Sequence, residues 1–228
     1  MCYHTALIAR PEELGRHFGR KTDLIRNFHP VYRICAFSHE KYPVVTGDEQ
    51  VQFFRWGLIP YWTRKAAETV TIRNQTVNAR AETIFEHTSF RVPIRRRRCL
   101  VPVSGFFGWR LEQARKVPYY VTLKEQPLVS LAGIFDSWID SESGEVVMTY
   151  SIITTEANPM MRYINNTDGR MPVILHPGDE ERWLSSDLSD KQIAALLQPY
   201  PEQAMEYQVV RHDFIRKVPH DPSILVPA

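Results

Sequence analysis

Residues 99–123 read CLVPVSGFFGWRLEQARKVPYYVTL, a stretch in which apolar runs alternate with short polar breaks. Three runs, at 99–103, 106–111 and 117–123, are rich in valine, leucine and aromatic side chains. Runs of this length and composition, bounded by turn-forming residues, are typical of β-strands. The stretch therefore predicts three successive strands, of which the first two are joined at Ser104 and Gly105.

Similar patterns continue on both sides of this stretch. Further strands are predicted at residues 51–58, 128–138, 146–154, 171–175 and 207–210. Helices are predicted at residues 11–18, 158–164, 179–184 and 189–197, with Pro11 near the start of the first and Ser189 as the N-cap of the last. Many strands in sequence with a few inserted helices favour an α+β fold with a curved or barrel-like sheet.

Length and composition are those of a globular protein. The 228 residues show no internal boundary, so residues 1–228 are expected to form a single domain. No apolar stretch approaches the roughly 18 residues of a membrane span, and the first ten residues lack the features of a signal peptide. The three cysteines, Cys2, Cys35 and Cys99, have no metal-ligand spacing. We therefore expect a cytoplasmic protein with no membrane association, no metal and no cofactor.

The charge distribution is more informative than the net charge of +2. Four consecutive arginines occupy positions 95–98, with Arg91 upstream and Arg110 downstream. Such a run usually forms a solvated face, and contact with nucleic acid is the alternative. Because Arg98 precedes a predicted strand, part of the run is expected to enter that strand.

Cys2 stands where removal of the initiator methionine would make it the N-terminus. The mature chain would then carry a 2-aminothiol, with a free α-amine and a thiol on adjacent carbons. The amine can attack an aldehyde to form an imine, and the thiolate can close onto the imine carbon to give a thiazolidine. The alternative is that Cys2 is incidental, because terminal residues often have no role.

Five segments together resemble one family. They are Met1 and Cys2, VNARAET at 77–83, CLVP at 99–102 continuing to GFFGW at 105–109, RMPVIL at 170–175, and FRWGLIP at 54–60. Taken in their order along the chain, they resemble the SOS-response-associated peptidase family, whose members are abasic-site processing proteins. The resemblance implies a single-domain pseudo-barrel with peripheral helices, and a monomer with a groove for single-stranded DNA. It also implies that Cys2 captures the ring-opened aldehyde of an abasic site as a thiazolidine.

The resemblance assigns roles to individual residues. Cys2 corresponds to the nucleophile, and Asn78 to an asparagine that holds the lesion or the terminal amine. Arg80 corresponds to a phosphate-contacting arginine, a role that guanidinium suits, and Arg170 is a second candidate for DNA contact. The DNA-stacking candidates are Trp62 and Trp109, for which core packing is the alternative.

Two departures from the family pattern affect the expected chemistry. Gly108 stands where the family usually has glutamate, and Asn165 is the best match to its histidine. Neither residue titrates, so neither acts as a general acid or base. The substitutes nearby in sequence are His4, Glu82, Glu112 and Asp168, of which His4 is the leading proton carrier because histidine titrates near neutral pH. Slow capture is therefore expected, and Gly108→Glu is expected to accelerate it.

Three functions remain open at this point. The first is covalent capture of abasic sites in single-stranded DNA. The second is a non-catalytic module that binds single-stranded DNA. The third is a cysteine peptidase limited to self-processing, although no histidine and asparagine pair is recognisable around Cys35 or Cys99. Whether the chain is an enzyme is thus left undecided, with retention of Cys2, Asn78 and Arg80 favouring capture.

Overall fold

The chain changes from one sheet to another at Ser104, between strands β6 (Arg98–Val103) and β7 (Gly105–Glu112). The computed structural model describes residues 2–228. At the crossing, Ser104 accepts a hydrogen bond from the Ile8 backbone on its hydroxyl oxygen at 2.9 Å. A Cβ atom on Gly105 would lie 2.5 Å from the Tyr120 ring, so only glycine fits here.

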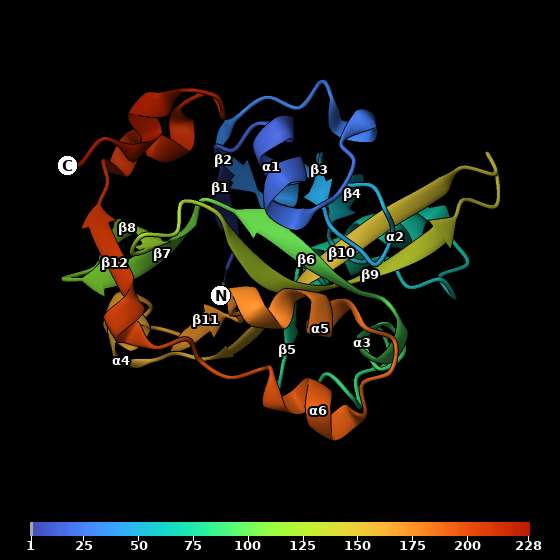
Figure 1. The fold of residues 1–228 in the computed structure, drawn as a ribbon. Helices are drawn as coiled ribbons and strands as arrows, with labels where there is room; N and C mark the ends of the chain where they lie inside the picture. Colours follow the sequence, from blue (N-terminus) through green and yellow to red (C-terminus); the bar gives the residue numbers. More distant parts are fainter. Residues whose placement is uncertain (1) are drawn as a thin grey trace.

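The first sheet has five strands. In spatial order they are β12 (Met205–Val209), β8 (Arg115–Leu123), β7, β1 (His4–Leu7) and β2 (Val31–Cys35). Every neighbouring pair in this sheet is antiparallel. Strand β1 is thus an interior strand, and it carries the N-terminal residues into the middle of the molecule (Figure 1).

The second sheet has a path of five strands with two more paired to β10. The path is β3 (Lys41–Val44), β4 (Gln52–Trp56), β10 (Val146–Glu156), β9 (Val129–Ile139) and β6, and the added strands are β5 (Asn78–Arg80) and β11 (Arg170–Pro172). Beyond β3, Val45 exchanges two backbone hydrogen bonds with Leu100 of β6, at 3.0 and 2.8 Å. This bridge connects the two ends of the path, so the sheet forms a nearly closed barrel.

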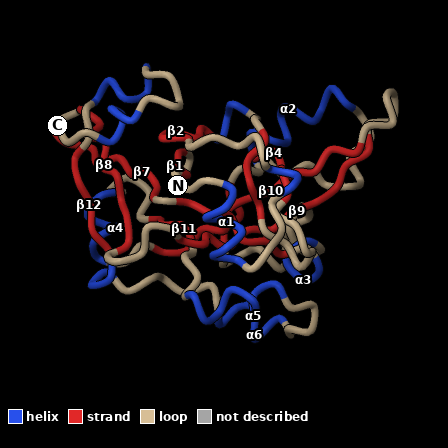
Figure 2. Tube along the Cα trace, turned by 45° about the horizontal axis from the view of Figure 1, so that its top comes forward, coloured by secondary structure: helices blue, strands red, loops and turns tan. Residues whose placement is uncertain are grey.

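The helices lie around the strands rather than among them (Figure 2). They are α1 (Pro11–Phe18), α2 (Ala66–Gln75), α3 (Pro93–Arg96), α4 (Pro159–Ile164), α5 (Glu180–Leu184) and α6 (Asp190–Ala195). Ser189 caps α6 as predicted, because its hydroxyl accepts the Gln192 N–H. The α+β single-domain fold with a barrel-like sheet and peripheral helices is therefore confirmed.

Aromatic side chains fill the barrel. Trp56 and Tyr150 are fully buried and their rings stack with centroids 5.9 Å apart. The Trp56 indole N–H donates to the Val77 carbonyl at 2.8 Å, which satisfies the polar atom of the ring inside the core.

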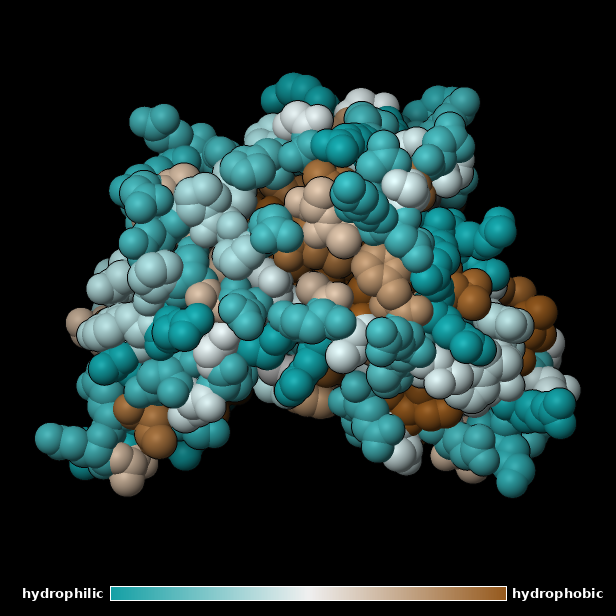
Figure 3. Space-filling model, turned by 90° about the horizontal axis from the view of Figure 1, so that it is seen from below, coloured by the Kyte–Doolittle hydropathy of each residue, from teal (hydrophilic) through white to brown (hydrophobic). Residues whose placement is uncertain are grey.

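On the face seen from below in Figure 1, apolar side chains gather in the hollowed middle between more hydrophilic lobes (Figure 3).

The arginine run at 95–98 mostly binds partners within the chain. Arg98 is buried, and its guanidinium donates to the carbonyls of Trp183 and Ile94, both at 2.7 Å, and to that of Ser185. Arg95 pairs with Asp190 at 2.7 Å, and Arg97 pairs with Asp136. Only Arg96 is exposed in this run, so the run as a whole is not a solvated face, and Arg98 enters β6 as expected. No helix within residues 2–228 is long and apolar enough to cross a membrane.

Candidate functional site

Cys2 and Asn78 are brought together by two different sheets. Strand β1 carries Cys2 to the side of β5, whose parallel pairing with β10 fixes the position of Asn78. The Asn78 side-chain amide donates to the Cys2 carbonyl oxygen at 2.8 Å. Its Oδ1 atom is buried and has no hydrogen-bond partner among residues 2–228. A buried acceptor with unused hydrogen-bonding capacity is therefore held close to Cys2.

The Cys2 thiol lies in a dry environment. Cys2 is only 2% exposed, and burial raises the pKa of its thiol to about 12. Its Sγ atom lies 4.0 Å from the His4 carbonyl oxygen, the acceptor for the thiol proton. The thiol is thus protonated at neutral pH, whereas the sequence alone suggested that a thiolate closes the ring. Removal of Met1, also predicted from the sequence, lies outside the described residues.

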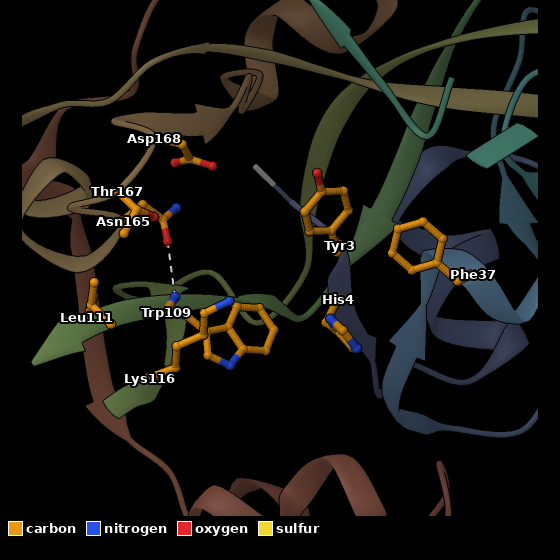
Figure 4. Close-up of a pocket in the computed structure, with 9 residues that line it drawn as sticks. All are labelled: Tyr3, His4, Phe37, Trp109, Leu111, Lys116, Asn165, Thr167 and Asp168. Carbon is orange, nitrogen blue, oxygen red and sulfur yellow. Dashed lines mark hydrogen bonds between the residues drawn. The ribbon is translucent and has the colours of Figure 1, made fainter. Parts of the chain in front are cut away.

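An aromatic pocket of about 260 Å³ opens at Tyr3 and His4, the two residues that follow Cys2 (Figure 4). It is lined by Tyr3, His4, Phe37, Trp109, Leu111, Lys116, Asn165, Thr167 and Asp168. The His4 and Trp109 rings are 5.0 Å apart, and the Tyr3 and Phe37 rings are 5.4 Å apart. Figure 4 shows Asn165 and Asp168 on the opposite side of the opening from Tyr3. The pocket therefore combines stacking surfaces with polar groups on one side.

A second pocket, the Asn78 pocket, adjoins the first. It has a volume of about 400 Å³ and is lined by Tyr3, Asn74, Gln75, Val77, Asn78, Arg80, Thr83, His87 and Phe90. Tyr3 lines both pockets, so they meet at the residue that follows Cys2. The exposed Arg80 lies at the end of β5 and gives the Asn78 pocket a positive charge. A ligand extending past Tyr3 would contact both pockets.

Asn165 links two parts of the site through its side chain. Its Oδ1 accepts the Trp109 backbone N–H at 3.1 Å (Figure 4), and its Nδ2 donates to the Arg170 carbonyl at 2.9 Å. A Cβ atom on Gly108 would lie 2.5 Å from Cγ2 of Ile164 and 2.9 Å from Oδ1 of Asn165. The two departures from the family pattern are therefore in contact, and glycine at 108 provides the space that Asn165 occupies. These contacts oppose the expectation that Gly108→Glu accelerates capture, because the larger side chain has no space here.

His4 differs from the proton carrier that the sequence suggested. Burial, and secondarily the charge of Arg33, lowers the pKa of His4 to about 4. Its Nδ1 atom is buried without a partner among residues 2–228, and its ring packs edge-on against Trp109 and Phe214. The expected titration near neutral pH is wrong, because the imidazole is uncharged there. His4 forms part of the aromatic wall.

This environment predicts an acid-sensitive fold. In the unfolded chain a histidine takes up a proton near pH 6.5, whereas folded His4 does so near pH 4. The unfolded state therefore binds more protons as the pH falls between these values, and stability on the order of 3 kcal/mol is lost there. Urea unfolding from pH 7 to pH 4 measures this loss. His4→Gln should flatten the pH dependence, the same change at the exposed His212 should not, and equal slopes for both variants would contradict the prediction.

The remaining DNA-binding candidates, Arg170, Trp62 and Trp109, lie in different environments. Arg170 is buried, and its guanidinium contacts both carboxylate oxygens of Glu82, at 3.1 and 2.9 Å, and the Thr154 carbonyl at 2.6 Å. In this arrangement Arg170 links Glu82 to Thr154 of β10. Trp62 is 44% exposed in the loop after β4, outside the lining of both pockets. Trp109 lies in the aromatic pocket.

Two aromatic residues of the site were not predicted from the sequence. Tyr3 and Phe37 form one wall of the aromatic pocket, and Tyr3 lies where the two pockets meet. Only the position of Tyr3 directly after Cys2 could have indicated its role. No sequence signal points to Phe37, because it reaches the site through the pairing of β2 with β1.

Comparison with known proteins places this site in a family context. The sequence matches the family described as "SOS response associated peptidase (SRAP)" over residues 1–216. It is 37% identical over 214 residues to the abasic site processing protein YoqW of Bacillus subtilis, covering 92% of each chain. It is 29% identical to the abasic site processing protein HMCES of Gallus gallus, covering 85% of this chain and 62% of that protein.

A solved structure shares the whole architecture. A crystal structure of a protein from Bacteroides thetaiotaomicron superposes with a TM-score of 0.98 at 44% identity, and the match covers 100% of both chains. A protein from Bordetella bronchiseptica, at 22% identity, has the same fold with a TM-score of 0.79 over 92% of this chain.

Proposed function

The chain belongs to the SOS response associated peptidase (SRAP) family, and we propose that it processes abasic sites in DNA by capturing them with its N-terminal cysteine. The proposal draws on the abasic site processing proteins to which the chain is similar, YoqW and HMCES. It includes single-stranded DNA as the partner and a monomer acting in the cytoplasm. The free thiols of Cys2, Cys35 and Cys99 are consistent with a reducing compartment.

The contact between Asn78 and Cys2 carries the proposal. Asn78 holds the Cys2 carbonyl at 2.8 Å, and its own Oδ1 atom lacks a partner within residues 2–228. That oxygen can accept a hydrogen bond from the α-amine of Cys2 or from a hydroxyl of the opened sugar. The two pockets meet at the adjacent Tyr3, which gives a DNA strand room on both sides of this residue.

The covalent chemistry requires no cofactor. After Met1 is removed, the neutral α-amine of Cys2 attacks the C1′ aldehyde of the ring-opened deoxyribose and forms a carbinolamine. Loss of one water gives the imine. The Cys2 sulfur then adds to the imine carbon, and the thiol proton passes to the nitrogen, which yields a thiazolidine. The sequence forms one C–N and one C–S bond and releases one water in total.

Proton transfer in this site depends on few titrating groups. Asn165 is fixed by two hydrogen bonds, and burial leaves His4 uncharged at neutral pH. Asp168 faces the aromatic pocket across from Tyr3, and burial together with Asp168 raises the pKa of the Tyr3 phenol. We assign the handling of protons to Asp168 and to the amine itself, which makes capture slower than with a dedicated acid and base.

Intact-mass measurement tests the proposal. The protein is incubated with a single-stranded oligonucleotide carrying one abasic site, at pH 6, 7 and 8, with the undamaged oligonucleotide as control. The expected product has the combined mass of the Met1-free chain and the DNA minus one water. The rate of adduct formation should rise by more than about tenfold from pH 6 to pH 8. The α-amine has a pKa of about 7.7–8.0, so its neutral fraction increases over this range. A chain that retains Met1 and still forms the adduct would contradict the mechanism.

A non-catalytic DNA-binding module is the second candidate. The observation that favours it is the buried thiol, whose pKa of about 12 opposes formation of the thiolate. The same experiment separates the two functions. Tight binding of abasic DNA without an adduct at any pH would support the binding module.

A further inference from the structure

Two arginines converge on a single backbone carbonyl near the site. Arg55 of β4 donates to the His39 carbonyl oxygen at 3.0 Å, and Arg73 of α2 donates to the same oxygen at 3.4 Å. His39 itself has a left-handed backbone, with φ of 58°, and its Nδ1 lies 3.4 Å from the Trp56 carbonyl. We call Arg55, Arg73 and His39 the basic cluster.

The positive charge of the basic cluster is not balanced within the described chain. Neither arginine forms an ion pair with a carboxylate in residues 2–228. The two guanidiniums also act on each other, since burial and then the charge of Arg55 lower the pKa of Arg73. Like charges held together without a counterion are unfavourable, and a bound anion relieves the repulsion.

Hydrogen-bond donors are also left over. An arginine has five N–H donors, and each of these two uses one on the His39 carbonyl. The Arg73 Nε atom is buried and has no partner among residues 2–228. Fixing the turn at His39 would need only one donor from one arginine. The surplus donors fit an anion with several acceptor oxygens, which is the geometry of a phosphate group.

Residues close to the basic cluster along the chain line both pockets of the site. Asn74, which follows Arg73, lines the Asn78 pocket. Phe37, two residues before His39, lines the aromatic pocket. Gly57, with φ of 102°, fixes the position of Arg73, because a Cβ atom there would lie 2.9 Å from the Arg73 carbonyl oxygen. The cluster is therefore held in chain segments whose neighbouring residues line the site.

We propose that the basic cluster of Arg55, Arg73 and His39 binds one phosphodiester of the DNA strand that passes the Cys2 site. The proposal rests on the proposed function for its ligand. A strand phosphate is favoured over a free anion because Phe37 and Asn74, close to the cluster along the chain, line two pockets that a polymer would occupy together. Both arginines are only half-buried, which leaves the cluster open to a long ligand.

Binding of an undamaged single-stranded oligonucleotide tests the cluster without the covalent step. Fluorescence anisotropy at several salt concentrations compares wild type with Arg55→Gln, Arg73→Gln, Arg73→Lys and a control, Arg16→Gln. Arg16 is exposed on α1 and lies beside Ile8 and Ala9, at the other end of β1 from Cys2. Arg55→Gln and Arg73→Gln should each lose roughly 3- to 10-fold in affinity, with a salt slope smaller by about 0.7. Arg73→Lys should lose less, and thermal melting checks that all variants fold.

A second arm locates the phosphate. A series of oligonucleotides carries one uncharged methylphosphonate linkage, moved stepwise along the strand. At one position, this replacement should weaken DNA binding by the wild-type protein but not by Arg73→Gln. Losses equal to those of Arg16→Gln, or no such linkage, would overturn the proposal. Inorganic pyrophosphate that binds wild type but leaves DNA affinity unchanged would instead assign the cluster to a free anion and overturn the strand assignment. DNA binding that depends on the cluster without any covalent adduct would leave this inference intact and refute only the capture chemistry.

Discussion

A chain with two extra residues before Cys2 is expected to form no covalent adduct with abasic DNA, while the natural chain forms one. The thiazolidine needs the α-amine and the thiol on adjacent carbons of one residue, and an amide at Cys2 nitrogen cannot form the imine. The loss should be complete rather than partial, because the imine is the first intermediate of the reaction. Denaturing gel electrophoresis after incubation with abasic DNA measures the adduct.

Cys2→Ala is the matched variant for the thiol. It keeps an α-amine, so it should form only an imine, which hydrolyses on denaturation and survives only after reduction with borohydride. The natural chain should give a stable adduct without the reductant. Cys2→Ala and the natural chain should bind undamaged DNA with equal affinity, because the substitution leaves Arg80 and the basic cluster unchanged. A stable, unreduced adduct of Cys2→Ala would refute the role of the thiol.

Gly108→Glu is expected to destabilise the protein and to suppress capture. Its Cβ would meet Cγ2 of the buried Ile164 at 2.5 Å and Oδ1 of Asn165 at 2.9 Å. Overpacking of this kind costs about 1–3 kcal/mol. Displacing Asn165 would add the loss of its hydrogen bonds to Trp109 and Arg170, at about 1 kcal/mol each. Urea unfolding and an adduct time course measure the two effects.

Gly47→Glu is the control for this substitution. A Cβ atom on Gly47 has nothing within 4 Å, so the same side chain there should change stability by less than about 0.5 kcal/mol. Gly108→Glu combined with Ile164→Ala removes the closer of the two clashes and should recover part of the capture rate. A Gly108→Glu protein of wild-type stability that captures abasic DNA faster than wild type would show that the carboxylate fits.

Much of the second half of the fold could be predicted from the sequence. The stretch at 99–123 has strong apolar runs and gives β6, β7 and β8 within two residues at each end. The long strands β9 and β10 were also predicted, because burial along most of their length makes their composition distinctive. These strands belong to the core, where local composition and tertiary environment agree.

Other elements depend on tertiary contacts that leave little trace in the sequence. Strand β5 has only three residues and exists through its pairing with β10. Strand β1 is four residues long and is stabilised by neighbours on both sides. Helix α2 has no buried residue, so it lacks the apolar stripe from which helices are predicted.

The site was predicted in part for the same reason. Cys2 and Asn78 were identified from motifs, and the structure brings them into contact. The contact between Gly108 and Asn165 could not be predicted, since β7 and the end of α4 meet only in the folded protein. The pKa of His4 was mispredicted because sequence position says nothing of burial.

The place of Cys2 in the fold also sets a time limit on its maturation. Cys2 is 2% exposed and precedes β1, which is enclosed by β2 and β7. An aminopeptidase that removes Met1 has to hold the chain around Cys2 in an extended form, which the finished sheet does not offer. β7 begins at Gly105, so at ordinary synthesis rates the ribosome completes this partner about 5–20 s after β1. On the proposed mechanism, each molecule becomes reactive or stays inert according to whether processing outpaces folding on the nascent chain.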